Sequence, residues 1–167
     1  MSANPLDKKP PQNIEAEQSL LGCLMLDKNA IYKVVDFISA DDFYKETHRQ
    51  IFLAMFDLFE KTEPIDIISL STKLRERELI EKIGGSAYLT SLINMVPTAA
   101  HVATYAKSVR EKKVLRDLIE ISEEIGKDAF DETNEVDNLL DAAEKKVFSI
   151  GQRSLSKKFI PIKEILG

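Results

Sequence analysis

One stretch of the sequence restricts the fold more than any other, because residues 98–131 contain no proline and only one glycine, Gly126. Apolar side chains recur along this stretch at steps of three and four residues, which is the period of an α-helix. The simplest interpretation is a single helix of roughly thirty residues, which is long for a globular protein. A helix of this length must project from the rest of the chain or find a long partner.

A partner helix follows directly in the sequence. Residues 131–135 form a polar run, and a second helical pattern begins at Val136 and is predicted to end at Gly151. Two long helices joined by a short polar turn predict an antiparallel hairpin over residues 98–152. Its apolar arc is wider than one arm can cover, so either the globular part or a second copy of the chain packs there. We predict a homodimer with these hairpin contacts: Val114, Leu118, Ile121, Leu140 and Val147.

Charge is distributed unevenly along the predicted hairpin. Residues 107–116 carry a net charge of +4, whereas residues 117–144 carry a net charge of −10. A solvated surface explains any run of charges, but opposite charges at opposite ends also suit antiparallel pairing of two hairpins.

The preceding residues are predicted to form a small globular head of short helices. With 167 residues, the chain has the length of one domain. The fold class is therefore all-α, a small globular head followed by a long antiparallel helical hairpin. We expect a flexible tail over 1–12, then a head over 13–97 with Phe43 and Tyr44 as inward anchors in a loop and Gly84-Gly85 at a turn. The predicted head helices are 14–26 capped by Asn13, 30–38, 46–61, one from Asp66 or Ser69 to 78, and 86–96.

Several classes of function lack their sequence signature. No apolar run approaches the roughly 18 residues of a membrane span, and no secretory signal precedes the tail. The single cysteine, Cys23, lies in an apolar helical pattern and is predicted to be core, as in a reduced cytoplasm. His48 is predicted to be a partly buried, hydrogen-bonded histidine, and its distance from His101 in the sequence does not suit a metal-binding pair. We expect no catalytic residues, metal or cofactor.

The net charge of −5 and the lack of a glycine-rich phosphate loop also bear on function. We expect at most weak DNA binding and no hydrolysis of nucleoside triphosphates.

Short motifs along the chain carry a resemblance to a known family. In order and spacing they resemble the N-terminal region of the bacterial replicative DNA helicases of the DnaB family, over about residues 10–166. The motifs are Pro10 to Gly22, Asp42 to Tyr44, His48 to Phe52, Pro64 to Asp66, Gly84-Gly85, Ala87 to Leu89, Tyr105-Ala106 and Ala143-Glu144.

The resemblance implies an assembly and a set of partners. In this family the N-terminal domain is a non-catalytic collar, in which hairpins pair into dimers and three dimers form a hexamer in the full-length protein. The collar docks the C-terminal domain of primase, and a helicase loader is a further partner. ATP and magnesium belong to a motor domain that follows, and residues 153–167 resemble the start of the linker to it. By position, four residues resemble primase contacts of the family: Glu15, Tyr88, Ile119 and Ile125.

Two hypotheses of other classes stay open at this stage. One is a free-standing helical adaptor, which the full reading frame would distinguish from a helicase collar. The other is a small hydrolase with a site built from scattered acidic residues, which an activity or metal-binding screen would detect. For Ile119 and Ile125, a place in the core of the hairpin is the alternative to a partner contact.

Overall fold

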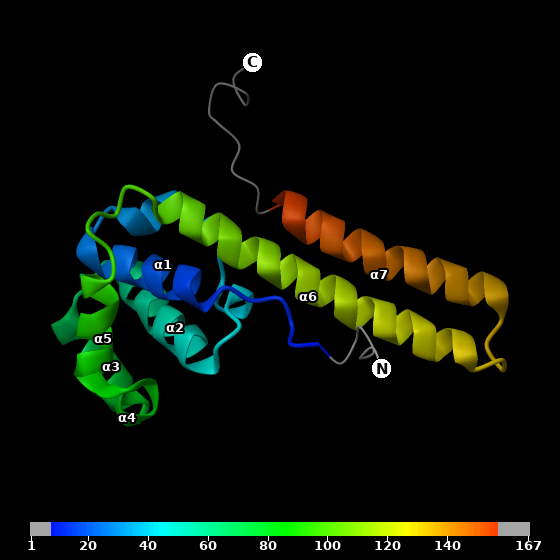
Figure 1. Ribbon diagram of the computed structural model, residues 1–167, viewed down its shortest axis with the longest axis horizontal. Coiled ribbons are helices and arrows are strands. Elements are labelled where there is room, and N and C mark those ends of the chain that lie inside the picture. The colour runs from blue at the N-terminus through cyan, green and yellow to red at the C-terminus, as the bar shows by residue number, and fades with distance from the viewer. Residues whose placement is uncertain (1–7, 157–167) are drawn as a thin grey trace, which may run out of the picture.

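The computed structural model describes residues 8–156, and within that range it contains helices and turns but no strand, which confirms the all-α prediction. Figure 1 shows the short helices gathered at one end and two long helices projecting from them as a hairpin. Most of the predicted tail 1–12 (residues 1–7) and of the predicted linker 153–167 (residues 157–167) lies outside the described residues. The elements are α1 (Ile14–Leu26), η2 (Ala30–Lys33), η3 (Ala40–Asp42), α2 (Glu46–Glu60), α3 (Ile67–Glu76), α4 (Ile80–Ile83), α5 (Gly85–Asn94), α6 (Val102–Phe130) and α7 (Val136–Ser156).

Helix α1 is the centre of the head and packs against α2, α5 and α6. Asn13 caps it as predicted, because its side-chain oxygen accepts a hydrogen bond from the N–H of Ala16. Leu20, Leu21 and Leu24 are fully buried, and Cys23 lies among them as predicted. A helix covered on several sides needs apolar residues over most of its circumference, and the sequence of α1 meets this requirement.

Gly22 allows α1 and α5 to approach each other closely. A Cβ atom at this position would overlap the carbonyl oxygen of Leu92 and would lie 3.2 Å from Cγ2 of Val96. Gln18, one turn earlier on α1, donates a hydrogen bond to the hydroxyl of Tyr88, one turn earlier on α5. Gly22 therefore lies at the point where α1 and α5 contact each other.

The segment 30–38 was predicted to be a helix, and this prediction was wrong. Only η2 is helical, with 3₁₀ geometry, and the chain continues as turns in which the N–H of Phe37 bonds to the carbonyl of Val34. These turns bring Val34 and Ile38 into the core and leave the carbonyl of Phe37 to accept from Arg110 of α6. Tertiary contacts therefore override the local helical pattern in this segment.

Helices α2 and α3 agree with the prediction, and Asp66 rather than Ser69 caps α3, since its carboxylate accepts from the N–H of Ser69. The one-turn helix α4 was not predicted. Gly84 follows it with a φ of 105°, a left-handed conformation that favours glycine, and α5 begins at once. This turn orients α5 so that Tyr88 lies against the core.

The hairpin shares its base with the head. Val102, Ala106 and Val109 of α6 belong to the head core, so the head does cover the first part of the long helix. Beyond them α6 packs along α7. Gly151 was predicted to stop the second arm, but α7 continues to Ser156. The extra turn is held because the guanidinium of Arg110 donates to the carbonyl of Arg153 at 2.8 Å.

Candidate protein-interaction surfaces

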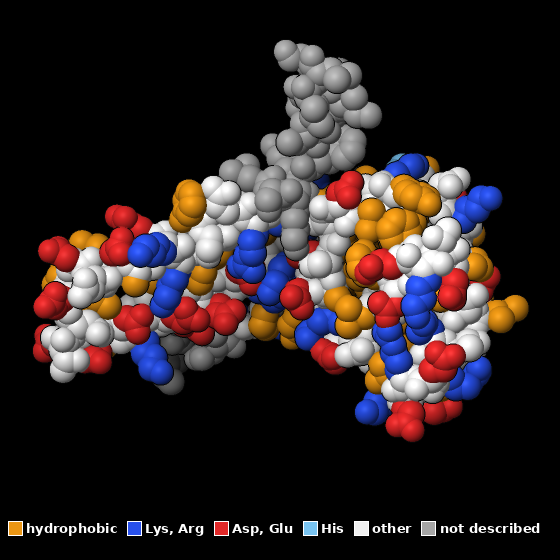
Figure 2. All heavy atoms as spheres, turned by 180° about the vertical axis from the view of Figure 1, so that it is seen from behind, with side chains coloured by type: hydrophobic (Ala, Val, Ile, Leu, Met, Phe, Trp, Pro, Cys, Tyr) orange, Lys and Arg blue, Asp and Glu red, His pale blue; other side chains and the backbone are white. Residues whose placement is uncertain are grey.

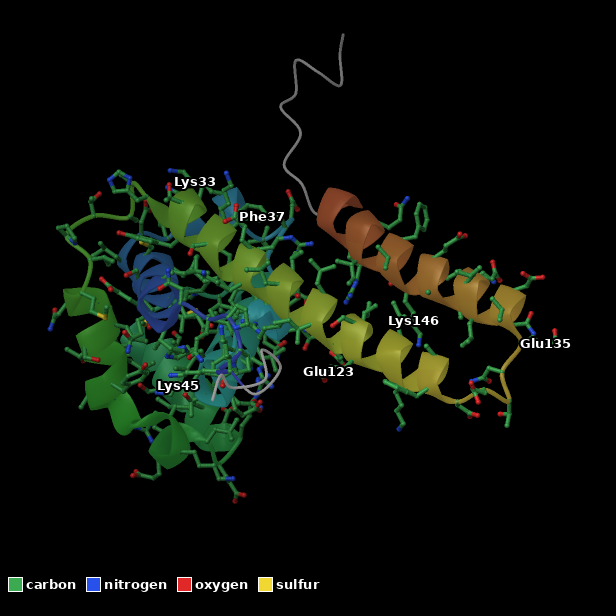
Figure 3. All side chains as sticks on the ribbon, turned by 45° about the vertical axis from the view of Figure 1, so that its right-hand side comes forward. Lys33, Phe37, Lys45, Glu123, Glu135 and Lys146 are labelled. Atoms are coloured by element: carbon green, nitrogen blue, oxygen red, sulfur yellow. The ribbon has the colours of Figure 1, made fainter. Side chains whose placement is uncertain are left out.

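Ion pairs between α6 and α7 hold the two arms of the hairpin together. The ammonium of Lys146 lies 3.3 Å from carboxylate oxygens of both Glu124 and Asp128, and these hydrogen bonds raise the pKa of Lys146. Nearer the head, Arg153 lies 3.2 Å from the carboxylate of Asp117. Figure 3 shows Lys146 pointing from α7 toward α6. These pairs identify the faces through which the arms contact each other.

The tip of the hairpin is a polar turn that Asp131 organises. Its carboxylate accepts from the N–H and the hydroxyl of Thr133, and these bonds lower the pKa of Asp131. Figure 2 shows acidic side chains gathered around the tip and basic ones nearer the head. Phe130, at the end of α6, is 91% exposed beside this acidic tip. The hairpin therefore has an acidic tip and a basic end near the head, as the sequence indicates.

An apolar stripe follows one flank of each arm. Because an α-helix turns by about 100° per residue, the stripe lies roughly 60–100° around α6 and roughly 110–130° around α7 from the face that contacts the other arm, in the same rotational sense. In antiparallel helices, the same sense places both stripes on one side of the hairpin. We call this side the apolar face. Four of the five predicted dimer contacts lie on it: Leu118, Leu140 and Val147 are exposed, and Val114 is half-buried. The fifth, Ile121, is half-buried and lies between this face and the contact of the two arms.

Inside the head, α1, α2 and α5 meet in a chain of hydrogen bonds. Glu17 is 1% exposed and its carboxylate lies 2.8 Å from Nδ1 of the fully buried His48. On the other side of the ring, Nε2 of His48 lies 2.6 Å from the hydroxyl of Tyr88. The carboxylate also accepts from the backbone N–H groups of Tyr44 and Lys45. A buried carboxylate with these donors is satisfied, as a buried charge must be.

Two arginines donate hydrogen bonds to backbone carbonyls in or next to the loop that joins η3 to α2. Arg116 of α6 donates to the carbonyls of Pro11 and Asp42, and its guanidinium lies 5.4 Å from the centroid of the Tyr44 ring. Partial burial of this guanidinium lowers the pKa of Arg116. Arg49 donates to the carbonyls of Phe43 and Tyr44. The loop that joins η3 to α2 is thus fixed by charged side chains rather than by regular secondary structure.

The four residues that resemble primase contacts fall into two groups. Glu15 is exposed on α1, one turn before the glutamine that bonds to the hydroxyl of Tyr88, so these two lie on the head. Ile119 and Ile125 lie on α6, about 15 and 24 Å beyond Val109 at the edge of the head core. Ile119 is exposed, and Ile125 is half-buried on the flank that carries the apolar face. Two of the four residues therefore lie on the head, and two lie on α6 beyond the head core.

Sequence reasoning missed how the buried polar residues are paired. His48 was predicted to be hydrogen-bonded and partly buried, whereas it is fully buried. Glu17 and Arg116 were not singled out. No local signal marks them, because an acid and an arginine on predicted helices normally lie on the solvated face. Their partners are brought to them only by the packing of separate helices.

Three further features bear on the kind of site. Within residues 8–156, no three His, Cys, Asp or Glu side chains are grouped as metal ligands. The helices of that range include none that combines the length and the apolar character needed to cross a bilayer. Burial raises the pKa of the Cys23 thiol to about 11, so this thiol is not a reactive nucleophile.

Known structures share this arrangement of head and hairpin. The crystal structure of the N-terminal domain of DnaB helicase from Mycobacterium tuberculosis matches with a TM-score of 0.79 and 36% identity, covering 85% of this chain and 99% of that one. A structure described as a DnaB-like replicative helicase and its interactions with primase matches with a TM-score of 0.69 over 83% of this chain and 31% of that one. At 24% identity, the second match shows the fold alone.

Relatives of known function show the same likeness in sequence. The replicative DNA helicase DnaC of Bacillus subtilis and the replicative DNA helicase DnaB of Geobacillus stearothermophilus are each 41% identical over 160 residues, which is 96% of this chain. The chain spans only 35% of the length of each of these relatives. The family model described as "DnaB-like helicase N terminal domain" matches residues 9–111, more than half of the chain. The chain therefore belongs to the family of DnaB-like helicase N-terminal domains.

Proposed function

We propose that this chain is the collar domain of a hexameric replicative DNA helicase, which assembles through its hairpin and docks primase. Three hairpin dimers would form the hexamer of the full-length protein. The chain performs no catalysis itself, and ATP and magnesium bind to a motor domain outside these 167 residues. Its setting is the replisome in the bacterial cytoplasm, where a helicase loader is a further partner.

The exposed apolar face of the hairpin is the main observation that supports the proposed dimer. Leu118 is 41% exposed on α6 near the head, Leu140 is 58% exposed on α7 near the tip, and Val147 is 49% exposed on α7 between these two levels. Exposed apolar side chains along one side of two paired helices, with charged residues around them, are typical of a surface that packs against another protein. A second hairpin offers the same face, so a two-fold axis would bury both stripes in a four-helix contact.

Sedimentation equilibrium tests the assembly, and the chain offers a matched control. Leu118→Asp places a carboxylate in the proposed contact, where an unpaired buried charge costs several kcal/mol. Leu53 of α2 is also 41% exposed but lies on the head. We expect dimers for wild type and Leu53→Asp, and folded monomers for Leu118→Asp. A wild-type chain that stays monomeric at high concentration would contradict the proposal.

Primase docking is supported by the shared fold of the DnaB-like replicative helicase whose structure describes its interactions with primase. Tyr88 offers that partner a half-buried aromatic ring on a helix that carries no charged residue. We expect Tyr88→Ala to weaken binding to the C-terminal domain of the cognate primase by roughly 1–3 kcal/mol and to leave the helical content unchanged. Calorimetric titration and a thermal melt give the answer. Unchanged affinity with a lower melting temperature would remove Tyr88 from the docking surface.

The absence of catalysis and of strong DNA binding is tested on the same sample. We expect no turnover of ATP above background. Residual DNA binding should come from the basic base of the hairpin and fall steeply as salt is added, because each contact with a phosphate releases counterions. ATP turnover that survives further purification would contradict this part of the proposal.

A further inference from the structure

Glu17, His48, Tyr88 and Gln18 form a buried hydrogen-bond network. With a neutral imidazole, only one arrangement of protons gives every polar group of this network a hydrogen-bond partner. The carboxylate accepts, so Nδ1 of His48 carries the proton and donates across the 2.8 Å contact. Nε2 is then an acceptor, and the hydroxyl of Tyr88 donates to it across 2.6 Å. The hydroxyl oxygen in turn accepts from the side-chain N–H of Gln18 at 3.3 Å. In this arrangement each hydrogen bond has one donor and one acceptor, and each of these polar atoms has a partner.

This hydrogen-bond network controls the position of the Tyr88 ring as well as its hydroxyl. The ring is held end to end with the imidazole of His48 by this hydrogen bond, with planes 10° apart and centroids at 6.0 Å. The ammonium of Lys45 lies 5.5 Å from the centroid of the Tyr88 ring. The N–H of Lys45 donates to the same carboxylate of Glu17 that holds His48. One buried carboxylate therefore fixes both a surface ring and the backbone of the residue that places a cation over it.

We propose that Glu17 and His48 are positioning residues of the docking surface, which hold Tyr88 and Lys45 in the orientation that the partner binds. This inference rests on the proposed function, specifically on the contact between Tyr88 and primase. Both residues act from below the surface and do not touch the partner. A side chain that is already ordered loses less conformational entropy on binding, which is worth about 0.5–1.5 kcal/mol for one immobilised side chain. This range corresponds to a change in affinity of roughly 2- to 12-fold.

A double-mutant cycle on the full chain distinguishes positioning from direct contact. Tyr88→Phe removes only the hydroxyl, and His48→Phe keeps an aromatic ring in place of the imidazole but removes both nitrogens. Affinity for the C-terminal domain of the cognate primase is measured by calorimetry for each variant and for the pair. We expect each single change to weaken binding by roughly 2- to 12-fold and the pair to bind no more weakly than His48→Phe. A full additional loss from Tyr88→Phe in the His48→Phe background would show that the hydroxyl contacts primase directly, and would overturn the proposal.

A second measurement needs no variant and so does not depend on whether His48→Phe folds. Nitrogen chemical shifts of the imidazole, recorded by NMR on the wild-type chain, report which nitrogen of His48 carries the proton. We expect the Nδ1–H form, and the Nε2–H form would overturn the proposal. Tyr88→Ala distinguishes this inference from the function on which it rests. Unchanged affinity for Tyr88→Ala removes the docking role itself, whereas weakened affinity with an additive cycle overturns only the positioning role.

Discussion

The contact between α1 and α5 at Gly22 leads to a prediction whose sign is decided by packing. In a helix interior, replacing glycine by alanine normally stabilises a protein by roughly 0.5–1 kcal/mol, because the unfolded chain loses freedom. At Gly22 the new methyl group would meet the carbonyl of Leu92. That carbonyl belongs to the backbone of α5 and cannot rotate away as a side chain would. Overpacking of this kind costs about 1–3 kcal/mol, and a rigid neighbour places the cost near the upper end.

The expected result for Gly22→Ala is a loss of about 2 kcal/mol of unfolding free energy, which is about 3 from overpacking less about 1 from helix propensity. For a chain of this size the melting temperature should fall by about 4–8 °C. Circular dichroism melts at low protein concentration measure it. Gly126→Ala in α6 is the matched control, because nothing lies within 4 Å of a Cβ there. We expect that variant to be equally or more stable than wild type.

The same change should reach the docking surface. Displacing α5 from α1 separates Gln18 from the hydroxyl of Tyr88, which bond across this contact. Gly22→Ala should therefore also weaken primase binding, whereas Gly126→Ala should not. A Gly22→Ala variant at least as stable as wild type would show that the two helices separate without cost, and would refute the argument from close packing.

The remaining predictions concern the loop arginine and the buried thiol. Arg116→Ala should lower the unfolding free energy by about 1–3 kcal/mol in denaturant titrations, because the carbonyls of Pro11 and Asp42 lose a charged donor. Arg116→Lys should recover less than half of this loss, since one ammonium cannot serve both carbonyls, and full recovery would contradict the role of the guanidinium. Burial raises the pKa of Cys23 from 9.0 to about 11, so the unfolded thiol ionises first as pH rises. Its contribution to stability should be present below pH 9 and lost by about pH 11, and Cys23→Ala should make stability fall less steeply over that window than in wild type. Equal slopes for the two proteins would refute it.

Helix periodicity alone was enough to predict most of the elements and the hairpin. The proline-free stretch became α6, the polar run 131–135 became the turn at the tip, and Asn13 caps α1. These features depend on neighbours within a few residues, where backbone propensity and side-chain period act directly. The two wrong predictions share a different cause, which is contact with residues far away in the sequence. The segment 30–38 and the end of α7 are decided by contacts with Arg110, which comes from another part of the chain.

The sequence by itself thus determined the all-α class, the long hairpin and its excess of apolar surface. Only the tertiary structure decided which part of that surface the head covers and which part stays exposed as the apolar face. It also decided the pairing of Glu17 with His48 and Tyr88, which are 31 and 71 residues away along the chain. Local patterns report which face of a helix is buried, but not which helix covers it. A buried polar group finds its partner only when separate helices pack together, and here that packing depends on the close approach at Gly22.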